Sequence, residues 1–166
     1  YNIFAAANQL CIDNIVFASS ETVLGLPFDQ PPPYVPVDEE IPLRPNSTYS
    51  LGKVLEEEMA RHFCRWSSNL KMVALRFSNV MEPQDYRNFP TFDGDARTRK
   101  WNLWTYIDAR DGAQAVRMAL QYKPRGFEAF IIANADSVMS RANHELLNEL
   151  FPNVPHKREF GANESL

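Results

Sequence analysis

The chain has 166 residues, of which 45% are hydrophobic and 23% charged, and its formal net charge is −4. This length fits one domain with a sizeable core. The absence of a basic stripe and of a long apolar run argues against nucleic acid and membranes as partners. Two isolated cysteines, Cys11 and Cys64, are interpreted as buried free thiols, which favours a reducing, cytoplasmic compartment.

The chain opens with a helix-like pattern at residues 2–10 that has neither a preceding cap nor an initiating methionine, which suggests that a front half is missing. Residues 14–18 form a short apolar run typical of a parallel-sheet strand buried on both faces. Seven of the twelve prolines fall within residues 21–48. Because prolines oppose helices and most strand pairing, we expect a long functional loop there.

The clearest helix is predicted from Tyr49 to about Trp66, with Ser47 or Thr48 as its cap. A period of about 3.6 residues predicts its inward face. The residues of that face are Leu51, Leu55, Met59, His62, Phe63 and Trp66.

The second half of the chain continues to alternate strands and helices after a strand at residues 71–77. A polar stretch at 78–100 is expected to lie at the surface or to line a pocket. The further elements expected are strands at 104–107 and 127–133, a helix capped by Asp111 that ends at Tyr122, and a helix at 140–151. The apolar positions expected to face inward on the two helices are Ala115, Val116, Ala119, Leu120, Leu146, Leu147 and Leu150. This alternation predicts an α/β fold with a largely parallel sheet.

One helical face brings a phenol and an ammonium group together, because Tyr49 and Lys53 are four residues apart. A neighbouring positive charge favours the phenolate and so makes a tyrosine a better base. Ser20 ends the first strand, at the edge where open α/β sheets bind their ligands. The alternatives are that Tyr49 is an amphipathic residue at a helix start, that Lys53 is solvated, and that Ser20 belongs to a turn or cap.

Four ordered segments carry a resemblance to a known family. They are residues 17–25, residues 39–53 together with Glu57, residues 75–80 and residues 106–111. In this order they resemble the extended short-chain dehydrogenases/reductases, the NAD-dependent epimerase/dehydratase family. The resemblance implies part of a Rossmann-type parallel sheet with flanking helices, and NAD or NADP as cofactor.

The resemblance also implies roles for individual residues. Ser20 would hydrogen-bond the substrate oxygen, Tyr49 would act as the acid/base, and Lys53 would hold the nicotinamide ribose. Phe77 and Ser78 fall where the family lines the nicotinamide. The alternative for Phe77 is a core aromatic residue.

Asn79 falls where the family contacts substrate, and its alternative is a turn residue. Arg76 is expected to pair with a carboxylate under the sheet. Residues 82–87 are faintly similar to uronate dehydrogenases, where an arginine meets the sugar carboxylate, which makes Arg87 a candidate substrate residue. The alternative for Arg87 is a solvated charge.

The sequence departs from the family pattern at several positions. Leu24 stands where the family usually has tyrosine, and residues 81–83, which begin with Met81, replace the usual Tyr-Gly-Pro. The residues around the sugar are therefore expected to differ from those of typical nucleotide-sugar epimerases. Glu21 stands where dehydratases carry an acid and is a candidate substrate residue, but Thr22 breaks their Asp-Glu pair, which disfavours dehydration. The glycine-rich phosphate loop is not found in the sequence. The three histidines lack metal-ligand spacing, so no metal is implied.

These observations predict a single partial domain, with substrate-binding segments at about residues 78–105 and 134–166. We expect an NAD(P)-dependent oxidoreductase or epimerase that acts on a sugar or sugar derivative. The family commonly dimerises through the Tyr/Lys helix and its neighbour, so a homodimer is expected. The alternatives are a non-catalytic binding module, an NAD-sensing regulator and an inactive fragment that retains the scaffold.

Overall fold

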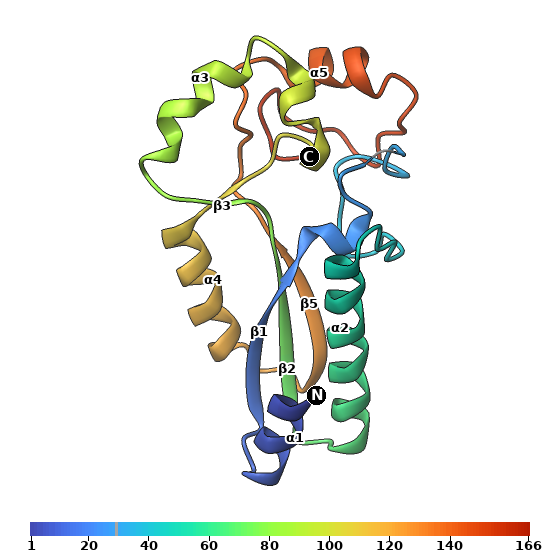
Figure 1. Cartoon of the computed structure of the whole chain (residues 1–166), viewed down its shortest axis with the longest axis vertical. Coiled ribbons are helices and arrows are strands. Elements are labelled where there is room, and N and C mark those ends of the chain that lie inside the picture. Colours follow the sequence, from blue (N-terminus) through green and yellow to red (C-terminus); the bar gives the residue numbers. More distant parts are fainter. Residues whose placement is uncertain (29) are drawn as a thin grey trace.

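A three-stranded parallel sheet lies at the centre of the computed structural model, which describes residues 1–28 and 30–166. Its strands are β1 (Asn14–Ser20), β2 (Lys71–Phe77) and β5 (Gly126–Ile132), in the order β1-β2-β5 (Figure 1). At the carboxyl end of the sheet, Ser20 is in register with Phe77, and Phe77 with Ile132. The predicted α/β fold with a parallel sheet is confirmed.

Burial differs sharply between the central strand and its neighbours. β2 is buried from Lys71 to Arg76, whereas most of β1 and all of β5 are only partly buried or exposed. The expectation that residues 14–18 are buried on both faces is therefore wrong. Within the described sheet β1 is an edge strand, and its Asn14 and Ala18 are exposed.

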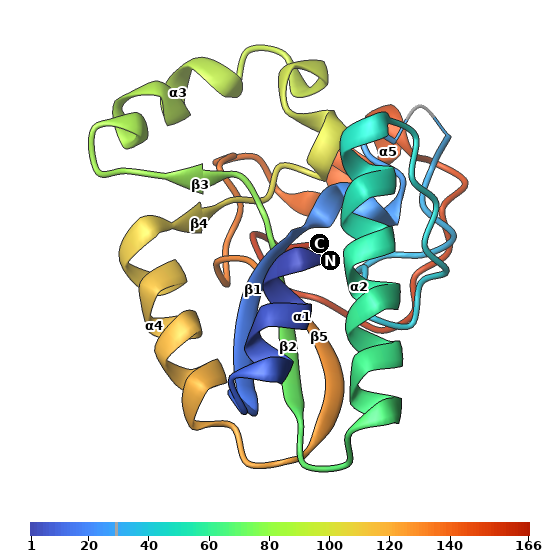
Figure 2. The ribbon, with the colours of Figure 1, turned by 60° about the horizontal axis from the view of Figure 1, so that its bottom comes forward.

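Helices cover both faces of the sheet. α2 (Thr48–Trp66) runs along one face and α4 (Ala109–Gln121) along the other (Figure 1). α1 (Asn2–Gln9) lies beside β1 (Figure 2), where Phe4 packs against Phe17 and Phe63 with ring centroids 5.2 and 6.0 Å apart. No helix in the described part of the chain combines the length and the apolar character needed to span a membrane.

The start of α2 is as predicted, but its inward face is predicted only in part. Ser47 caps the helix, and its side chain and that of Ser50 bond each other's backbone N–H groups in a capping box. The buried positions of the helix are Ser50, Glu57, Ala60 and Phe63, whereas Leu51, Leu55 and Trp66 are 47%, 54% and 64% exposed. Of the predicted positions, Phe63 is buried and Met59 is partly buried against the same cluster, but the others are exposed because the buried Glu57 occupies part of the face on the sheet.

α4 begins three residues earlier than predicted. Its cap is Asp108, whose carboxylate accepts from the Arg110 backbone N–H at 2.8 Å, and Asp111 lies within the first turn. The strand expected at 104–107 is the short β4 (Ile107–Asp108), which pairs with β3 (Val80–Met81) (Figure 2). Of the four positions expected inward on α4, Ala119 is buried and Ala115 half-buried. Val116 and Leu120 are 36% and 47% exposed.

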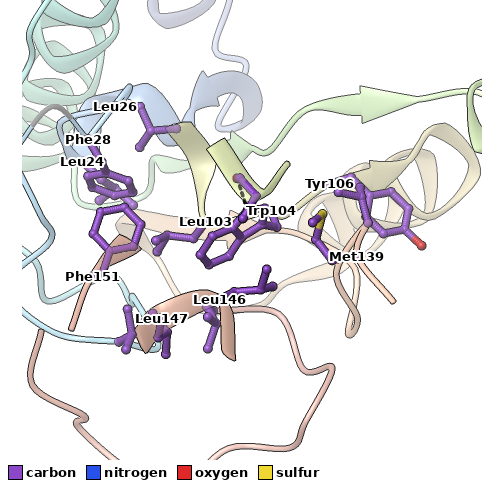
Figure 3. Packing of buried hydrophobic residues seen from close by; sticks show 14 of the residues in the cluster. Leu24, Leu26, Phe28, Leu103, Trp104, Tyr106, Met139, Leu146, Leu147 and Phe151 are labelled. Atoms are coloured by element: carbon purple, nitrogen blue, oxygen red, sulfur yellow. Dashed lines mark hydrogen bonds between the residues drawn. The ribbon is translucent and has the colours of Figure 1, made fainter. Parts of the chain in front are cut away.

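A second core lies beyond the carboxyl ends of the strands. It includes Trp104, whose indole N–H donates to the Ala96 carbonyl at 2.8 Å and whose ring meets Phe151 at 6.1 Å (Figure 3). α5 (Asn143–Leu150) adds Leu146 and Leu147 to this core. The remaining pieces are α3 (Phe89–Phe92) and the 3-10 turns Glu21–Leu24, Asp85–Asn88, Ala96–Thr98 and Lys100–Asn102.

The proline-rich segment forms the loop that the sequence predicts. Among its described residues before α2 begins at Thr48, the only helical piece is the turn Glu21–Leu24, and Asp29 lies outside the description. The cysteines are free, but Cys11 is exposed and Cys64 half-buried. The expectation of two buried thiols is therefore wrong for Cys11, which has a φ of 56° in the exposed turn after α1.

A buried ion pair joins α2 to the sheet. The fully buried Glu57 accepts hydrogen bonds from Arg76 Nε at 3.0 Å and Arg76 Nη2 at 2.8 Å, and from Ser19 Oγ at 2.6 Å. The expected carboxylate partner of Arg76 is thereby confirmed. The two bonds from the guanidinium and the third from the serine hydroxyl can together offset the free-energy cost of removing these charges from water.

We predict that Glu57→Gln lowers the free energy of unfolding by about 3–5 kcal/mol, because it leaves the Arg76 charge buried without its partner. Urea unfolding measures the change. Glu58→Gln is the matched control, since Glu58 pairs with Arg61 at the surface and such pairs contribute about 0–1 kcal/mol. Equal losses in the two variants would contradict this role of the buried pair.

Candidate active site

Ser20 lies where β1 meets the turn Glu21–Leu24, and it caps that turn. Its Oγ accepts from the Thr22 backbone N–H at 3.2 Å and from Thr22 Oγ1 at 3.0 Å. A hydroxyl has two acceptor positions and one donor. Both acceptor positions are used, and within the described residues the O–H has no acceptor, so Ser20 can donate to a ligand oxygen.

Tyr49 and Lys53 share a face in the first turns of α2. The Lys53 Nζ lies 5.9 Å from the centroid of the Tyr49 ring, and the Tyr49 side chain is 58% exposed. Lys53 Nζ donates to the Ala18 carbonyl at 2.9 Å and to Glu56 Oε2 at 3.0 Å. Lys53 is therefore not simply a solvated charge, and one of its three N–H donors remains for another acceptor.

The bond from Lys53 to Ala18 joins the two parts of the site. Ala18 lies two residues before Ser20 on β1, so the helix that carries Tyr49 is fixed beside the strand that carries the serine. Lys53 and Glu56 also line a cavity of about 730 Å³ along the exposed side of β1. The arrangement offers a phenol, an ammonium and a hydroxyl donor near one end of one strand.

Phe77 and Ser78 follow each other at the end of β2, and both contact other parts of the protein. Phe77 is half-buried in the apolar cluster under α4, where its ring faces Gly112. Ser78 is buried, and its Oγ lies 2.9 Å from Thr105 Oγ1. Their contact with a nicotinamide stays a prediction.

Asn79 and Arg87 stay predictions as well. Asn79 is half-exposed, and its backbone carbonyl accepts from the Ile107 N–H at 3.1 Å. Arg87 is exposed and makes no ion pair with the residues that the structure describes. Its neighbour Tyr86 donates to Asp108, where Arg110 holds the pKa of the carboxyl well below its usual range.

Glu21 is buried among polar side chains that sequence reasoning missed. Its carboxylate accepts from Asn102 Nδ2 and from Thr105 Oγ1, both at 3.3 Å, and the side chain is 7% exposed. Burial raises the pKa of Glu21 to about 7, although the hydrogen bonds and Arg99 act in the opposite direction. About eighty residues separate the partners in the sequence, so local patterns carry no signal for this contact.

We predict that Glu21 makes stability depend on pH. Its pKa is raised from 4.5 to about 7 on folding. Between these values the unfolded chain is ionised while the folded chain still holds the proton, so stability falls as pH rises from 4.5 to 7 and levels off above. Relative to Glu21→Gln, the wild type should lose about 3 kcal/mol across this window.

Urea unfolding at a series of pH values measures this difference. Glu128→Gln, at an exposed position of β5, is the control for loss of one carboxylate. Parallel stability profiles of the wild type and Glu21→Gln would show that Glu21 is not the responsible group.

Comparison with known proteins gives consistent results. Residues 1–133 match the NAD dependent epimerase/dehydratase family. A protein of Methanocaldococcus jannaschii, named provisionally as a UDP-glucose 4-epimerase, is 40% identical over 96% of this chain and 52% of its own length.

Solved structures show the same fold. A crystal structure of UDP-galactose 4-epimerase matches with a TM-score of 0.61 and 27% identity over 82% of this chain and 47% of that chain. Uronate dehydrogenase from Agrobacterium tumefaciens matches with a TM-score of 0.59 and 21% identity over 93% of this chain and 51% of that one, which is a likeness of fold. The chain thus spans about half the length of these relatives. With the family match covering most of its residues, the chain belongs to the NAD dependent epimerase/dehydratase family.

Proposed function

We propose that Ser20, Tyr49 and Lys53 form the proton-transfer site of an NAD(P)-dependent oxidoreductase or epimerase that acts on a sugar or a nucleotide-linked sugar. The observation that carries this proposal is the hydrogen bond from Lys53 to Ala18, which fixes the helix of Tyr49 beside the strand of Ser20. Family membership supports an NAD-type cofactor.

The residues present fit such a cofactor and a carbinol substrate. The remaining N–H of Lys53 can donate to a ribose hydroxyl, and the free O–H of Ser20 can donate to the substrate oxygen. Tyr49 takes the carbinol proton or returns it, and the ammonium of Lys53 lies 5.9 Å from the centroid of its ring. A bound nicotinamide supplies hydride acceptance and donation.

Two observations bear on the substrate. The relatives at 40% and 27% identity are named for UDP-glucose and UDP-galactose, which supports a nucleotide-linked hexose. The segments 78–105 and 134–166 lie together beyond the strand ends, where the Val138 N–H donates to the Trp104 carbonyl at 2.9 Å. We propose that these segments form the substrate-binding region of a single domain.

Tyr49→Phe tests the proton-transfer role. Loss of the phenolic O–H is expected to lower turnover by roughly 10²–10⁴-fold, while NAD affinity stays within about twofold. Turnover and NAD binding are measured on the natural full-length protein. Tyr122→Phe, near the opposite end of the sheet, is the matched control, and equal turnover in the two variants would refute the assignment.

We also propose a homodimer formed through α2 and its neighbour α1. Leu51 and Leu55 are exposed on α2, and Ile3 of α1 is 79% exposed. Exposed apolar residues on two adjacent helices are suited to an isologous contact with a second copy.

The dimer predicts that Leu51→Lys combined with Leu55→Lys yields a monomer, because the change puts four unpaired charges into the two-fold contact. Sedimentation equilibrium measures the mass. Met118→Lys on α4, where Met118 is 59% exposed, is the control. A dimer that survives the double substitution but not the Met118 substitution would place the contact on the other face of the sheet.

A further inference from the structure

Residues 155–160 form a surface flap between two anchored points. The first five residues of the flap are exposed, whereas Phe151, shortly before it, is buried in the second core. Directly after the flap, the Gly161 carbonyl accepts from Asn143 Nδ2 at 3.1 Å, and Asn143 is fully buried. An exposed segment with few buried apolar contacts and fixed ends is the kind of segment that opens locally while the rest of the fold stays intact.

The flap lies against a strap, residues 34–40 of the proline-rich loop, which the fold holds in place. Figure 2 shows this light-blue loop beside the red C-terminal segment. Val35 of the strap is fully buried, and the Glu39 carboxylate accepts from the Ile131 N–H of β5 at 2.8 Å. The strap is therefore the fixed side of the contact, and the flap is the side that is free to move.

Backbone bonds and an ion cluster join the flap to the strap. The Val35 N–H donates to the Pro155 carbonyl at 3.0 Å, and the Lys157 N–H donates to the Val35 carbonyl at 2.8 Å. The Lys157 side chain adds the ion cluster, because its Nζ donates to Asp38 Oδ2 at 2.5 Å and to Glu40 Oε2 at 2.6 Å. Lys157 thus contributes to both kinds of contact.

The ion cluster is a contact that can be broken. The side chains of Lys157, Asp38 and Glu40 are 38%, 31% and 79% exposed. Ion pairs at such positions contribute little individually and are screened by salt. Tyr34 joins the cluster, since its O–H donates to Asp38 Oδ1 at 2.6 Å and its ring centroid lies 4.8 Å from Lys157 Nζ. A network of this strength favours the closed flap without making it permanent.

The flap contributes to the rim of a cavity of about 260 Å³. The lining of the cavity includes Glu21, Val37 of the strap and Arg158 of the flap. The Arg158 side chain is 56% exposed although it lines the cavity, so it lies at the rim. A second cavity, of about 270 Å³, is lined by residues 31–32 and 150–155. It leaves space for the base of the flap to move.

We propose that residues 155–160 open and close the cavity beside Glu21, and that Lys157 is the latch of this flap. In the closed state Lys157 holds the flap against Asp38 and Glu40. When the ion cluster breaks, the flap moves away from the strap about its two anchored ends and admits a ligand to the cavity. The inference goes beyond the proposed function, because it concerns access to the cavity whatever ligand enters.

Thiol labelling of the natural full-length protein, with its own cysteines replaced, measures this opening. The reporter is Leu26→Cys, because Leu26 lines the cavity and is 5% exposed. We expect Lys157→Gln to raise the rate of reaction with N-ethylmaleimide about tenfold, since the latch is lost. Lys157→Arg keeps the charge and should leave the rate within about twofold. Sodium chloride at about 0.5 M should accelerate labelling of the parent but not of Lys157→Gln.

Two controls distinguish opening of the flap from general loosening of the fold. Arg141→Gln removes an ion pair with Glu149 outside the flap and should leave labelling at position 26 unchanged. Ala60→Cys places the reporter at a fully buried position of α2, where Lys157→Gln should have no effect on labelling. Equal labelling at position 26 in the parent and in Lys157→Gln, or equal acceleration at both reporters, would overturn the inference.

Hydrogen exchange decides the matter if Leu26→Cys fails to fold. Lys157→Gln should speed exchange of the backbone amides of Val35 and of position 157 about tenfold, and should leave the Ile131 amide unchanged. Unchanged exchange at all three amides would contradict the latch. Neither measurement uses NAD or a sugar, so their failure leaves the proposed function standing, and a failure to turn over any sugar leaves their results in force.

Discussion

The buried ion pair between Glu57 and Arg76 is the constraint on which the position of the candidate site depends. An unpaired charge at this depth would be strongly destabilising, so α2 must place Glu57 over Arg76 and Ser19. Tyr49, Lys53 and Glu57 follow each other at intervals of four residues and so lie along one stripe of the helix. Once Glu57 is fixed, Lys53 meets the carbonyl of Ala18, and Tyr49 follows one turn further along.

The protein buries a second carboxylate in a different way. Glu57 has a guanidinium partner with two short bonds, and the pair has a structural role. Glu21 is bonded only by an amide and a hydroxyl, each at 3.3 Å, and its pKa rises to about 7. Perturbed carboxylates in a cavity are candidates for ligand contact. The contrast explains why Glu57 is expected to contribute to stability, whereas Glu21 remains a proposed substrate residue.

Capping residues and short apolar patterns in the sequence predicted the helices and strands whose bounds depend on neighbouring residues. The cap at the start of α2, the length of α2 and the buried run of β2 follow from capping residues and apolar patterns near each position. The inward face of α2 could be predicted only in part in this way. A period locates an apolar stripe, but the contact of Glu57 with a strand nineteen residues away decides which stripe faces the sheet.

In the candidate site, too, local sequence patterns predicted some residues, whereas others depend on contacts between distant parts of the chain. The spacing of Tyr49 and Lys53 predicted a shared face, and the end of β1 predicted the place of Ser20. Asn102 lies in a polar stretch without a motif, and only the folded chain brings it to Glu21. Cap choice failed at α4 because Asp108 and Asp111 are equally good capping residues, and the pairing of β4 with β3 fixes the first of them at the helix start.

The most direct test of the account is a single-turnover experiment on the natural full-length protein with NAD(P) and a sugar labelled with deuterium at the reacting carbinol carbon. Mass spectrometry of the nicotinamide after a rapid quench measures whether the label has moved. The account predicts deuterium in the reduced nicotinamide, because the site removes the proton of the carbinol hydroxyl while the deuterium leaves the adjoining carbon as deuteride. Tight NAD(P) binding without transfer of deuterium from any of a panel of hexoses and nucleotide-linked hexoses would contradict it.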